Sequence, residues 1–196
     1  QALGVRGLTV ALVPGDSVGI EIAEPHPTLG LEGARLAAVR FSDCALDADA
    51  ILGKPGAGSR VFQIAMTYER ALVLAFRLGA MERQLEQALH YARSRRLGDQ
   101  PIARHQAVSH RVARMKLRLE TARLMTYRAA WELDQGKRGQ VEAALTKWHV
   151  AEQALDSSLD ALRLRGGEGF LSEGGFGRDV HEALGGTIHS GTSDVL

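Results

Sequence analysis

The sequence predicts a mainly α-helical protein, in which an up-down helical bundle follows a partial antiparallel β domain. Three observations lead to this prediction. Residues 1–57 alternate apolar with polar side chains and hold four of the five prolines. Residues 58–165 contain one proline, Pro101, and repeat apolar side chains at the spacing of a helix. Two short breaks divide this helical part, and short connections are typical of antiparallel neighbours in a bundle.

The N-terminal part, residues 1–57, predicts about three or four short antiparallel strands, of which three can be located. Alternation of apolar side chains places these strands at residues 8–12, 18–22 and 37–41. Proline, glycine and aspartate at residues 14–16 supply a turn between the first two strands. So small a set of strands has open edges, and we therefore expect residues 1–57 to be part of a larger β domain.

The remaining residues, 58–196, predict a helical bundle domain with three long helices. The first helix covers residues 59–96 and turns Leu78, Met81, Leu85 and Leu89 to one face. The other two helices carry seams of side chains spaced alternately by three and four residues. These seams are Val108, Val112, Met115, Leu119, Ala122, Thr126, Ala129 and Leu133, and then Val141, Leu145, Trp148, Glu152, Leu155, Leu159 and Leu162.

The connections and the C-terminal tail have their own signals. Breaks are expected at residues 98–101 and 135–139, where glycine and proline interrupt the helical pattern. The tail from residue 166 is rich in glycine around a short helical stretch at 178–184. Dense glycine after a helix indicates backbone that closely approaches a ligand or another subunit.

Composition excludes several classes of function. The chain of 196 residues has 24 Lys and Arg against 23 Asp and Glu, a balance that supports neither disorder nor nucleic-acid binding. The single cysteine, Cys44, excludes an internal disulfide and a multi-cysteine zinc site. His105 and His110 do not share a helical face, so no metal site is expected. The longest apolar run, residues 71–76, is far shorter than the roughly 18 residues of a membrane span. No secretory leader is recognisable, and we expect a cytoplasmic protein without membrane contact.

Four sequence motifs occur in order along the chain. Phe-Ser-Asp at residues 41–43 precedes Ile-Leu-Gly at 51–53, and residues 95–106 read RRLGDQPIARHQ. Residues 161–170 read ALRLRGGEGF, and residues 188–195 read IHSGTSDV. Together they resemble the acyl-CoA dehydrogenase family, over the later part of its middle β domain and its C-terminal helical bundle.

This resemblance implies an activity, a cofactor and an assembly. Members of the family use FAD to oxidise an acyl-CoA thioester to the trans-2-enoyl form. A carboxylate removes the α-proton while the β-hydrogen leaves as a hydride to the flavin. Bundles of the family associate face to face, so the resemblance implies a homodimer or tetramer, with a further partner subunit as an option.

The resemblance also implies a catalytic base. In most members the base is a glutamate directly before the Gly-Thr-Ser motif, but Ser190 occupies that position here. A minority of members place the glutamate on the first bundle helix, and Glu69 matches that position. A solvated glutamate paired with Arg70 or Arg77 remains the structural alternative. Arg70 itself matches a basic position near the CoA part of the substrate.

Further positions match residues that approach FAD in the family. Arg95 matches an arginine expected at the FAD phosphate of a neighbouring subunit, and Arg163 stands where a glutamine approaches the cofactor. The complete set of expected cofactor-binding residues is Arg95, Gln106, Arg163, Gly166, Gly167, Thr192 and Asp194. Two residues of the loop depart from the family pattern, because Gly98 replaces a packing phenylalanine and Asp99 replaces a turn glycine.

Three functions follow from these observations. The first is the C-terminal portion of an FAD-dependent acyl-CoA dehydrogenase with Glu69 as its base. The second is a catalytically degenerate subunit that builds an interface and lends FAD contacts to an active partner. The third is a carrier- or CoA-binding module without redox chemistry.

Overall fold

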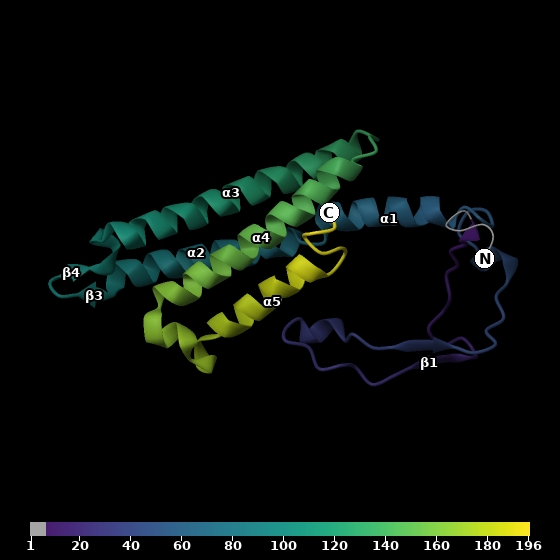
Figure 1. The fold of residues 1–196 in the computed structure, drawn as a ribbon, viewed down its shortest axis with the longest axis horizontal. Coiled ribbons are helices and arrows are strands. Elements are labelled where there is room, and N and C mark those ends of the chain that lie inside the picture. Colours follow the sequence, from purple (N-terminus) through teal and green to yellow (C-terminus); the bar gives the residue numbers. More distant parts are fainter. Residues whose placement is uncertain (1–6) are drawn as a thin grey trace. The chain divides into compact units, whose positions relative to one another are not determined.

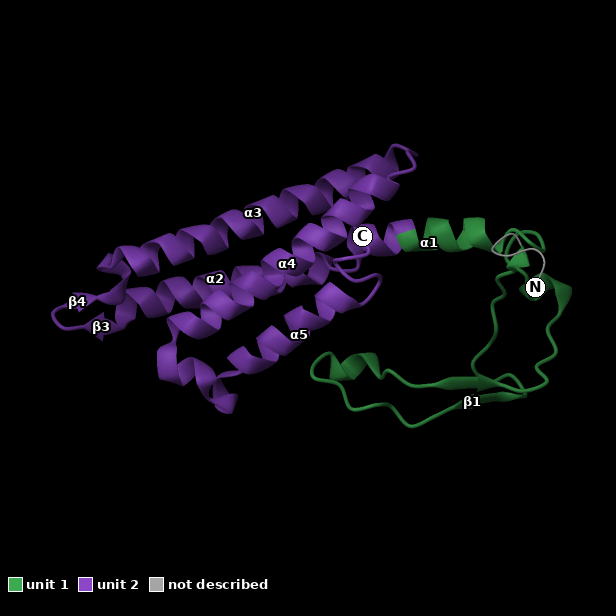
Figure 2. Ribbon diagram, in the orientation of Figure 1, with its two compact units in different colours: residues 1–66 green, residues 67–196 purple. Residues whose placement is uncertain are grey.

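The computed structural model describes residues 7–196, so the first six residues of the predicted β domain lie outside the described part. Figure 2 shows two compact units, residues 1–66 and 67–196. The division falls within α1 (Gly58–Leu72), whereas the sequence places the boundary at the start of this helix.

The first unit contains one small antiparallel sheet. Strands β1 (Ile20–Ile22) and β2 (Val39–Phe41) pair with Ile20 opposite Phe41. The two strands lie within the predicted strands 18–22 and 37–41. The predicted strand 8–12 is wrong as a regular strand, because it forms only one isolated bridge between Ala11 and Ile51. Its backbone pairs with the chain before the first helix, so it has no neighbouring strand of regular length.

The second unit is the helical bundle. Its helices are α2 (Ala75–Ser94), α3 (Gln106–Asp134), α4 (Gln140–Leu164) and α5 (Phe176–Ile188). Figure 1 shows α2, α3, α4 and α5 running side by side, and α4 packs against each of the other three. The mainly α-helical class with a small antiparallel sheet is therefore confirmed. No helix in residues 7–196 combines the length and hydropathy needed to cross a membrane.

The first predicted helix is two helices. The sequence predicts a continuous helix over residues 59–96, but α1 ends at Leu72 and α2 begins at Ala75. Leu74 leaves the helical conformation, with φ −100° and ψ 7°, and its side chain is only 3% exposed. Neither glycine nor proline marks this break in the sequence. It is accompanied by burial of the Leu74 side chain in the core of the bundle.

The core of the bundle confirms the expected faces of α2 and α3. On α2, Met81 and Leu85 are buried, and Leu78 and Leu89 pack against them. The seam of α3 is buried from its middle to its end, and its first two residues pack against the core. The buried members are Met115, Leu119, Ala122, Thr126, Ala129 and Leu133.

The predicted seam of α4 is not its buried face: its first three residues are exposed, and the last four, Glu152, Leu155, Leu159 and Leu162, are half-buried. Val141, Leu145 and Trp148 are exposed, while the buried face consists mostly of small side chains. This buried face includes Ala143, Val150, Ala151, Ala154, Ser157, Ser158 and Ala161. Because α4 has helices on three sides, small residues let its neighbours approach closely, while Val141, Leu145 and Trp148 face outward.

Glycines shape the two connections of the bundle. Strands β3 (Arg96–Leu97) and β4 (Gln100–Pro101) form a hairpin in which Gly98 has a φ of +61°. Gly98 therefore supplies the left-handed residue of this turn, while Asp99, at the position of the motif's glycine, does not have a positive φ. Gly139, with a φ of +58°, precedes α4 and lies so close to Leu133 that a side chain would collide.

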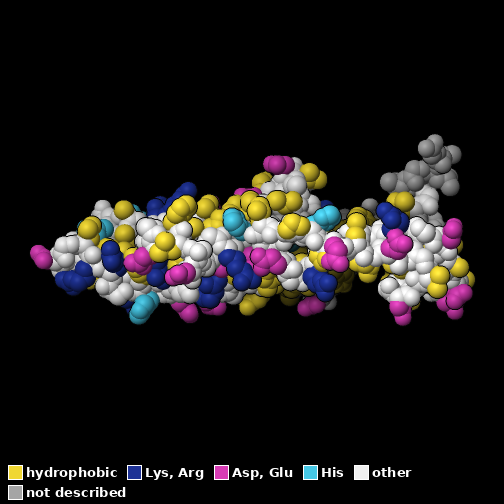
Figure 3. Space-filling view, turned by 90° about the horizontal axis from the view of Figure 1, so that it is seen from below, with side chains coloured by type: hydrophobic (Ala, Val, Ile, Leu, Met, Phe, Trp, Pro, Cys, Tyr) yellow, Lys and Arg dark blue, Asp and Glu magenta, His cyan; other side chains and the backbone are white. Residues whose placement is uncertain are grey.

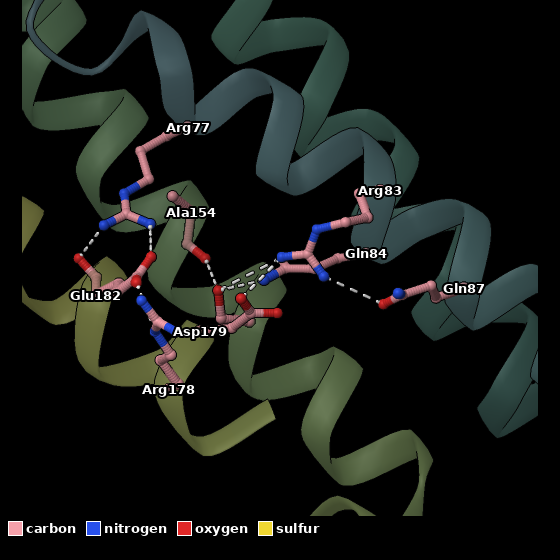
Figure 4. A network of polar contacts seen from close by, with 9 residues as sticks. Arg77, Arg83, Gln84, Gln87, Ala154, Arg178, Asp179 and Glu182 are labelled. Atoms are coloured by element: carbon pink, nitrogen blue, oxygen red, sulfur yellow. Dashed lines mark hydrogen bonds and ion pairs between the residues drawn. The ribbon is translucent and has the colours of Figure 1, made fainter. Parts of the chain in front are cut away.

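Ion pairs attach α5 to α2. The Arg77 guanidinium is 4% exposed and donates to the Glu182 side chain at 3.2 Å and to the Glu182 carbonyl. Arg83 pairs with Asp179 at 2.8 Å. Figure 4 shows both contacts near Gln84. Gln84 is buried and donates a hydrogen bond to the Ser158 hydroxyl of α4 at 3.0 Å. These contacts fix α5 and therefore the start of the C-terminal segment that follows it.

Candidate active site

Glu69 on α1 lies against Ser190 of the C-terminal segment. The Ser190 hydroxyl donates a hydrogen bond to Oε1 of the Glu69 carboxylate, across 121 positions of sequence. The two positions at which the resemblance allows a catalytic base are therefore in direct contact. Only one of them carries a carboxylate.

Two cations hold the segment that carries Ser190. Arg70 Nε donates to the Ser190 carbonyl at 3.1 Å, and Lys147 Nζ donates to the Gly191 carbonyl at 2.5 Å. Lys147 on α4 is completely buried. Burial lowers the pKa of Lys147 below its ordinary value, and the charge of Arg70 lowers it further, while Glu152 acts in the opposite direction. The segment is thus attached to both α1 and α4.

His189 completes this cluster. Its Nδ1 lies 3.3 Å from the Ser190 hydroxyl oxygen. Burial lowers the pKa of His189, the positive charge of Lys147 adds to this effect, and Glu69 opposes it. The neutral imidazole is therefore favoured near neutral pH. We define the Glu69 cluster as Glu69, Arg70, Lys147, His189, Ser190 and Gly191.

A second group of expected site residues lies at the opposite end of α2. Arg95 follows the last residue of α2, and its guanidinium lies 3.9 Å from the Glu168 carboxylate. Gly166 and Gly167 form the turn after α4, and Arg163 lies in the last turn of that helix. We define the Arg95 cluster as Arg95, Arg163, Gly166, Gly167 and Glu168.

The expected site residues therefore form two groups rather than one. The 20 residues of α2 span about 30 Å, which separates the Glu69 cluster from the Arg95 cluster. Thr192 and Asp194 directly follow the Glu69 cluster along the chain. Gln106 is exposed as the first residue of α3, and its carbonyl accepts a hydrogen bond from Ser109.

The Arg95 cluster fits a diphosphate such as that of FAD by the chemistry of its donors. The Arg95 side chain is 59% exposed and only loosely paired. Arg163 is exposed and has no ion pair or hydrogen bond from its side chain within residues 7–196. A side chain added at Gly166 or Gly167 would meet no atom within 4 Å, so the backbone there is open to close approach. Exposed guanidinium groups beside open backbone suit an anion with several oxygen acceptors.

The sequence analysis did not single out Lys147 and His189 of the Glu69 cluster, or Glu168 of the Arg95 cluster. Lys147 was not predicted because it lies on the buried face of α4, whereas the predicted seam follows another face of this helix. His189 carried no signal beyond its place in the last motif. Gly169 has a structural reason to be glycine, because a Cβ there would lie 2.1 Å from the Leu162 carbonyl oxygen.

Comparison with known proteins identifies the family. The profile of the acyl-CoA dehydrogenase C-terminal domain matches residues 56–196. The chain belongs to the acyl-CoA dehydrogenase family, as the four motifs imply. The family consists of flavin oxidoreductases that dehydrogenate CH–CH bonds.

Individual relatives differ in substrate. The chain is 46% identical to L-prolyl-[peptidyl-carrier protein] dehydrogenase of Pseudomonas fluorescens, over 99% of this chain and 50% of the relative. It is 32% identical to human mitochondrial short-chain specific acyl-CoA dehydrogenase, over 100% of this chain and 47% of the relative. A solved structure of PigA with FAD and proline superposes with a TM-score of 0.92 at 33% identity, over 97% of this chain and 50% of PigA. The chain thus spans about half the length of the curated relatives it matches.

Proposed function

We propose that this chain forms the C-terminal half of an FAD-dependent dehydrogenase that oxidises an L-prolyl group carried as a thioester on a peptidyl carrier protein. The observation that carries the proposal is the Glu69 carboxylate, held against Ser190 in the terminal motif. The choice of substrate rests on the 46% identity to a prolyl-carrier-protein dehydrogenase and on the likeness to the proline-bound PigA structure.

Glu69 is the base in this proposal. The thioester carbonyl makes the neighbouring α-proton acidic enough for a positioned carboxylate to remove. Bound FAD supplies the acceptor for the hydride that leaves the β-carbon, so the substrate loses two hydrogens and gains a carbon–carbon double bond. The proton stays on Glu69 until it passes to solvent.

The geometry favours an enzyme over a degenerate subunit. A degenerate chain needs no carboxylate at either of the two base positions, yet Glu69 is present and hydrogen-bonded to the terminal motif. Serine at position 190 therefore leaves that position without a carboxylate, while Glu69 still supplies one.

The two clusters support a shared cofactor site in an oligomer. We propose that Thr192 and Asp194, beside the Glu69 cluster, approach FAD of the same subunit. Arg95, Gln106, Arg163, Gly166 and Gly167 then face FAD of a neighbouring subunit, because about 30 Å separates the two ends of α2.

An exposed apolar surface on α3 and α4 suits such self-association. On the side of α4, Val141, Leu145 and Trp148 are 66%, 46% and 46% exposed, and the α3 surface adds several more apolar side chains. The α3 members are Leu117, Leu124, Tyr127 and Trp131. Figure 3 views the helical unit from the side opposite α3, where apolar side chains are scattered among charged ones. A dimer or tetramer that buries the apolar surface of α3 and α4 is expected, and Trp148→Arg should shift the molar mass in light scattering toward the monomer.

The experiment is flavin bleaching without oxygen. Protein expressed from its complete gene and purified with FAD is mixed with a prolyl-loaded carrier protein, with butyryl-CoA, or with free proline. We expect the flavin absorbance to bleach rapidly only with the prolyl-loaded carrier, since free proline lacks the activating thioester. Faster bleaching by butyryl-CoA would contradict the prolyl substrate and would indicate an acyl-CoA substrate, as the resemblance to the family implies.

Glu69→Gln tests the base in the same assay. This variant should retain FAD but lose bleaching, whereas Glu86→Gln makes the same chemical change at an exposed position of α2 outside both clusters. Normal bleaching by Glu69→Gln would contradict the assignment of the base. Loss of bleaching in both variants would point to a general effect of the substitution instead.

A further inference from the structure

We propose that Ser190 is a positioning residue that orients the Glu69 carboxylate, so that Oε1 is held and Oε2 is presented to the substrate. This inference rests on the proposed role of Glu69 as the base. It assigns a task to the serine that stands where most of the family carries glutamate.

The Glu69 carboxylate depends on Ser190 for its orientation. Glu69 is exposed on α1, and no other hydrogen bond or ion pair to its carboxylate occurs within residues 7–196. An exposed glutamate without a partner samples several side-chain conformations. The hydrogen bond from Ser190 selects one of them.

The backbone around Ser190 is built to deliver this hydroxyl. Ser190 adopts a left-handed conformation with a φ of 57°, which residues other than glycine rarely adopt. The next residue, Gly191, has a φ of 102°. Both residues have their carbonyl oxygens held by a cation, Ser190 by Arg70 and Gly191 by Lys147. Charged hydrogen bonds of this kind are stronger than neutral ones and offset an unfavourable backbone conformation.

His189 fixes the direction of the hydroxyl proton. Ser190 has a single hydroxyl proton, and that proton is donated to Glu69. The Ser190 oxygen can therefore only accept from His189 Nδ1, which lies 3.3 Å away. This arrangement requires the His189 tautomer that carries its proton on Nδ1, and it prevents the hydroxyl from turning away from Glu69.

Fixed orientation of the Glu69 carboxylate raises the rate of proton transfer. One oxygen held by a fixed donor leaves the other free to accept the α-proton, and no rotation of the side chain is needed during the transfer. Loss of orientation by about 1 Å can cost about 100-fold in rate.

The test compares substitutions of Ser190 in the FAD-loaded protein expressed from its complete gene. Ser190→Ala removes the hydroxyl and keeps Cβ, whereas Ser190→Gly removes the hydroxyl and tolerates the left-handed backbone. Ser190→Asn keeps a hydrogen-bond donor and suits a left-handed residue. Ser172→Ala, in an exposed turn after the Arg95 cluster, is the matched control.

We expect Ser190→Ala and Ser190→Gly to lower kcat about 10- to 100-fold, with KM within twofold and FAD content unchanged. Ser190→Asn should recover part of this loss, and Ser172→Ala should match the wild type. A kcat for Ser190→Ala within twofold of the wild type would overturn the positioning role, as would equal losses in all three Ser190 variants. These results leave the proposed function intact if Glu69→Gln is inactive, whereas an active Glu69→Gln contradicts the proposed base itself.

Discussion

Contact between Glu69 and Ser190 predicts that the catalytic carboxylate can be moved from one position to the other. Glu69→Gln removes the base, and adding Ser190→Glu restores a carboxylate at the neighbouring position. Because the Ser190 hydroxyl already touches the Glu69 carboxylate, both side chains reach the same region. The double variant should therefore regain activity that Glu69→Gln has lost.

The size of each effect follows from the geometry. Removal of a general base costs about 100- to 10,000-fold in rate. A glutamate at position 190 is longer than serine by two atoms, so its carboxylate will be displaced from the Glu69 carboxylate by an ångström or so, which costs about 100-fold. Taking about 1,000-fold for loss of the base and about 100-fold for the displacement, we expect the double variant to exceed Glu69→Gln by about tenfold and to remain about 100-fold below the wild type.

The single variant Ser190→Glu is the companion measurement. It places two carboxylates together near the surface, and like charges about 4 Å apart repel by about 1 kcal/mol in water-like surroundings. It should therefore unfold at a slightly lower temperature than the wild type, whereas the double variant, with one carboxylate, should not show this penalty.

The assay is the rate of anaerobic flavin bleaching under single-turnover conditions, with FAD content and far-UV circular dichroism as checks of folding. A double variant that binds FAD normally and is no more active than Glu69→Gln would refute the reasoning. That result would mean that the two positions do not face the same substrate atom.

Three further predictions concern stability. Glu182→Ala leaves Arg77 buried with only a backbone acceptor, so it should lower the free energy of unfolding by about 3 kcal/mol. Arg178→Ala, at an exposed position, should lower it by less than about 1 kcal/mol. Urea denaturation measures both. Leu119→Ala empties a site that is 1% exposed and should cost about 2–5 kcal/mol in the same measurement. Burial lowers the pKa of His149 in the folded protein. Between that lowered pKa and about 6.5, the unfolded chain therefore binds more protons than the folded protein. The free energy of unfolding should consequently fall as the pH drops below about 7. His149→Gln should flatten this dependence.

Each stability prediction has a clear contrary outcome. Equal losses for Glu182→Ala and Arg178→Ala would show that burial of Arg77 does not matter. A loss below about 1 kcal/mol for Leu119→Ala would contradict its place in the core. An unchanged pH dependence in His149→Gln would assign the acid sensitivity to other groups, of which His189 is the next to test.

The amphipathic pattern alone predicts the buried face of α3 correctly and that of α4 incorrectly. The apolar seam of α3 became its buried face because this helix presents one side to the core. Helix α4 has neighbours on three sides, so small residues such as Ala151 and Ala154 are buried and Trp148 is not. A search for bulky apolar residues therefore finds the outside of a central helix. The break at Leu74 was missed for a related reason, since burial of its side chain, not a glycine or proline, accompanies it.

The sequence by itself determined the family, the helical class, the connections at residues 98–101 and 135–139 and the candidate status of Glu69, because these depend on local patterns and motifs. Tertiary structure alone brought Ser190 onto Glu69 across 121 positions and placed Lys147 beneath the terminal segment. It also separated the expected cofactor residues into two groups at the ends of α2. The physical reason is that such contacts depend on how helices pack and where a chain with left-handed residues turns back, and neither is encoded in any single stretch of sequence.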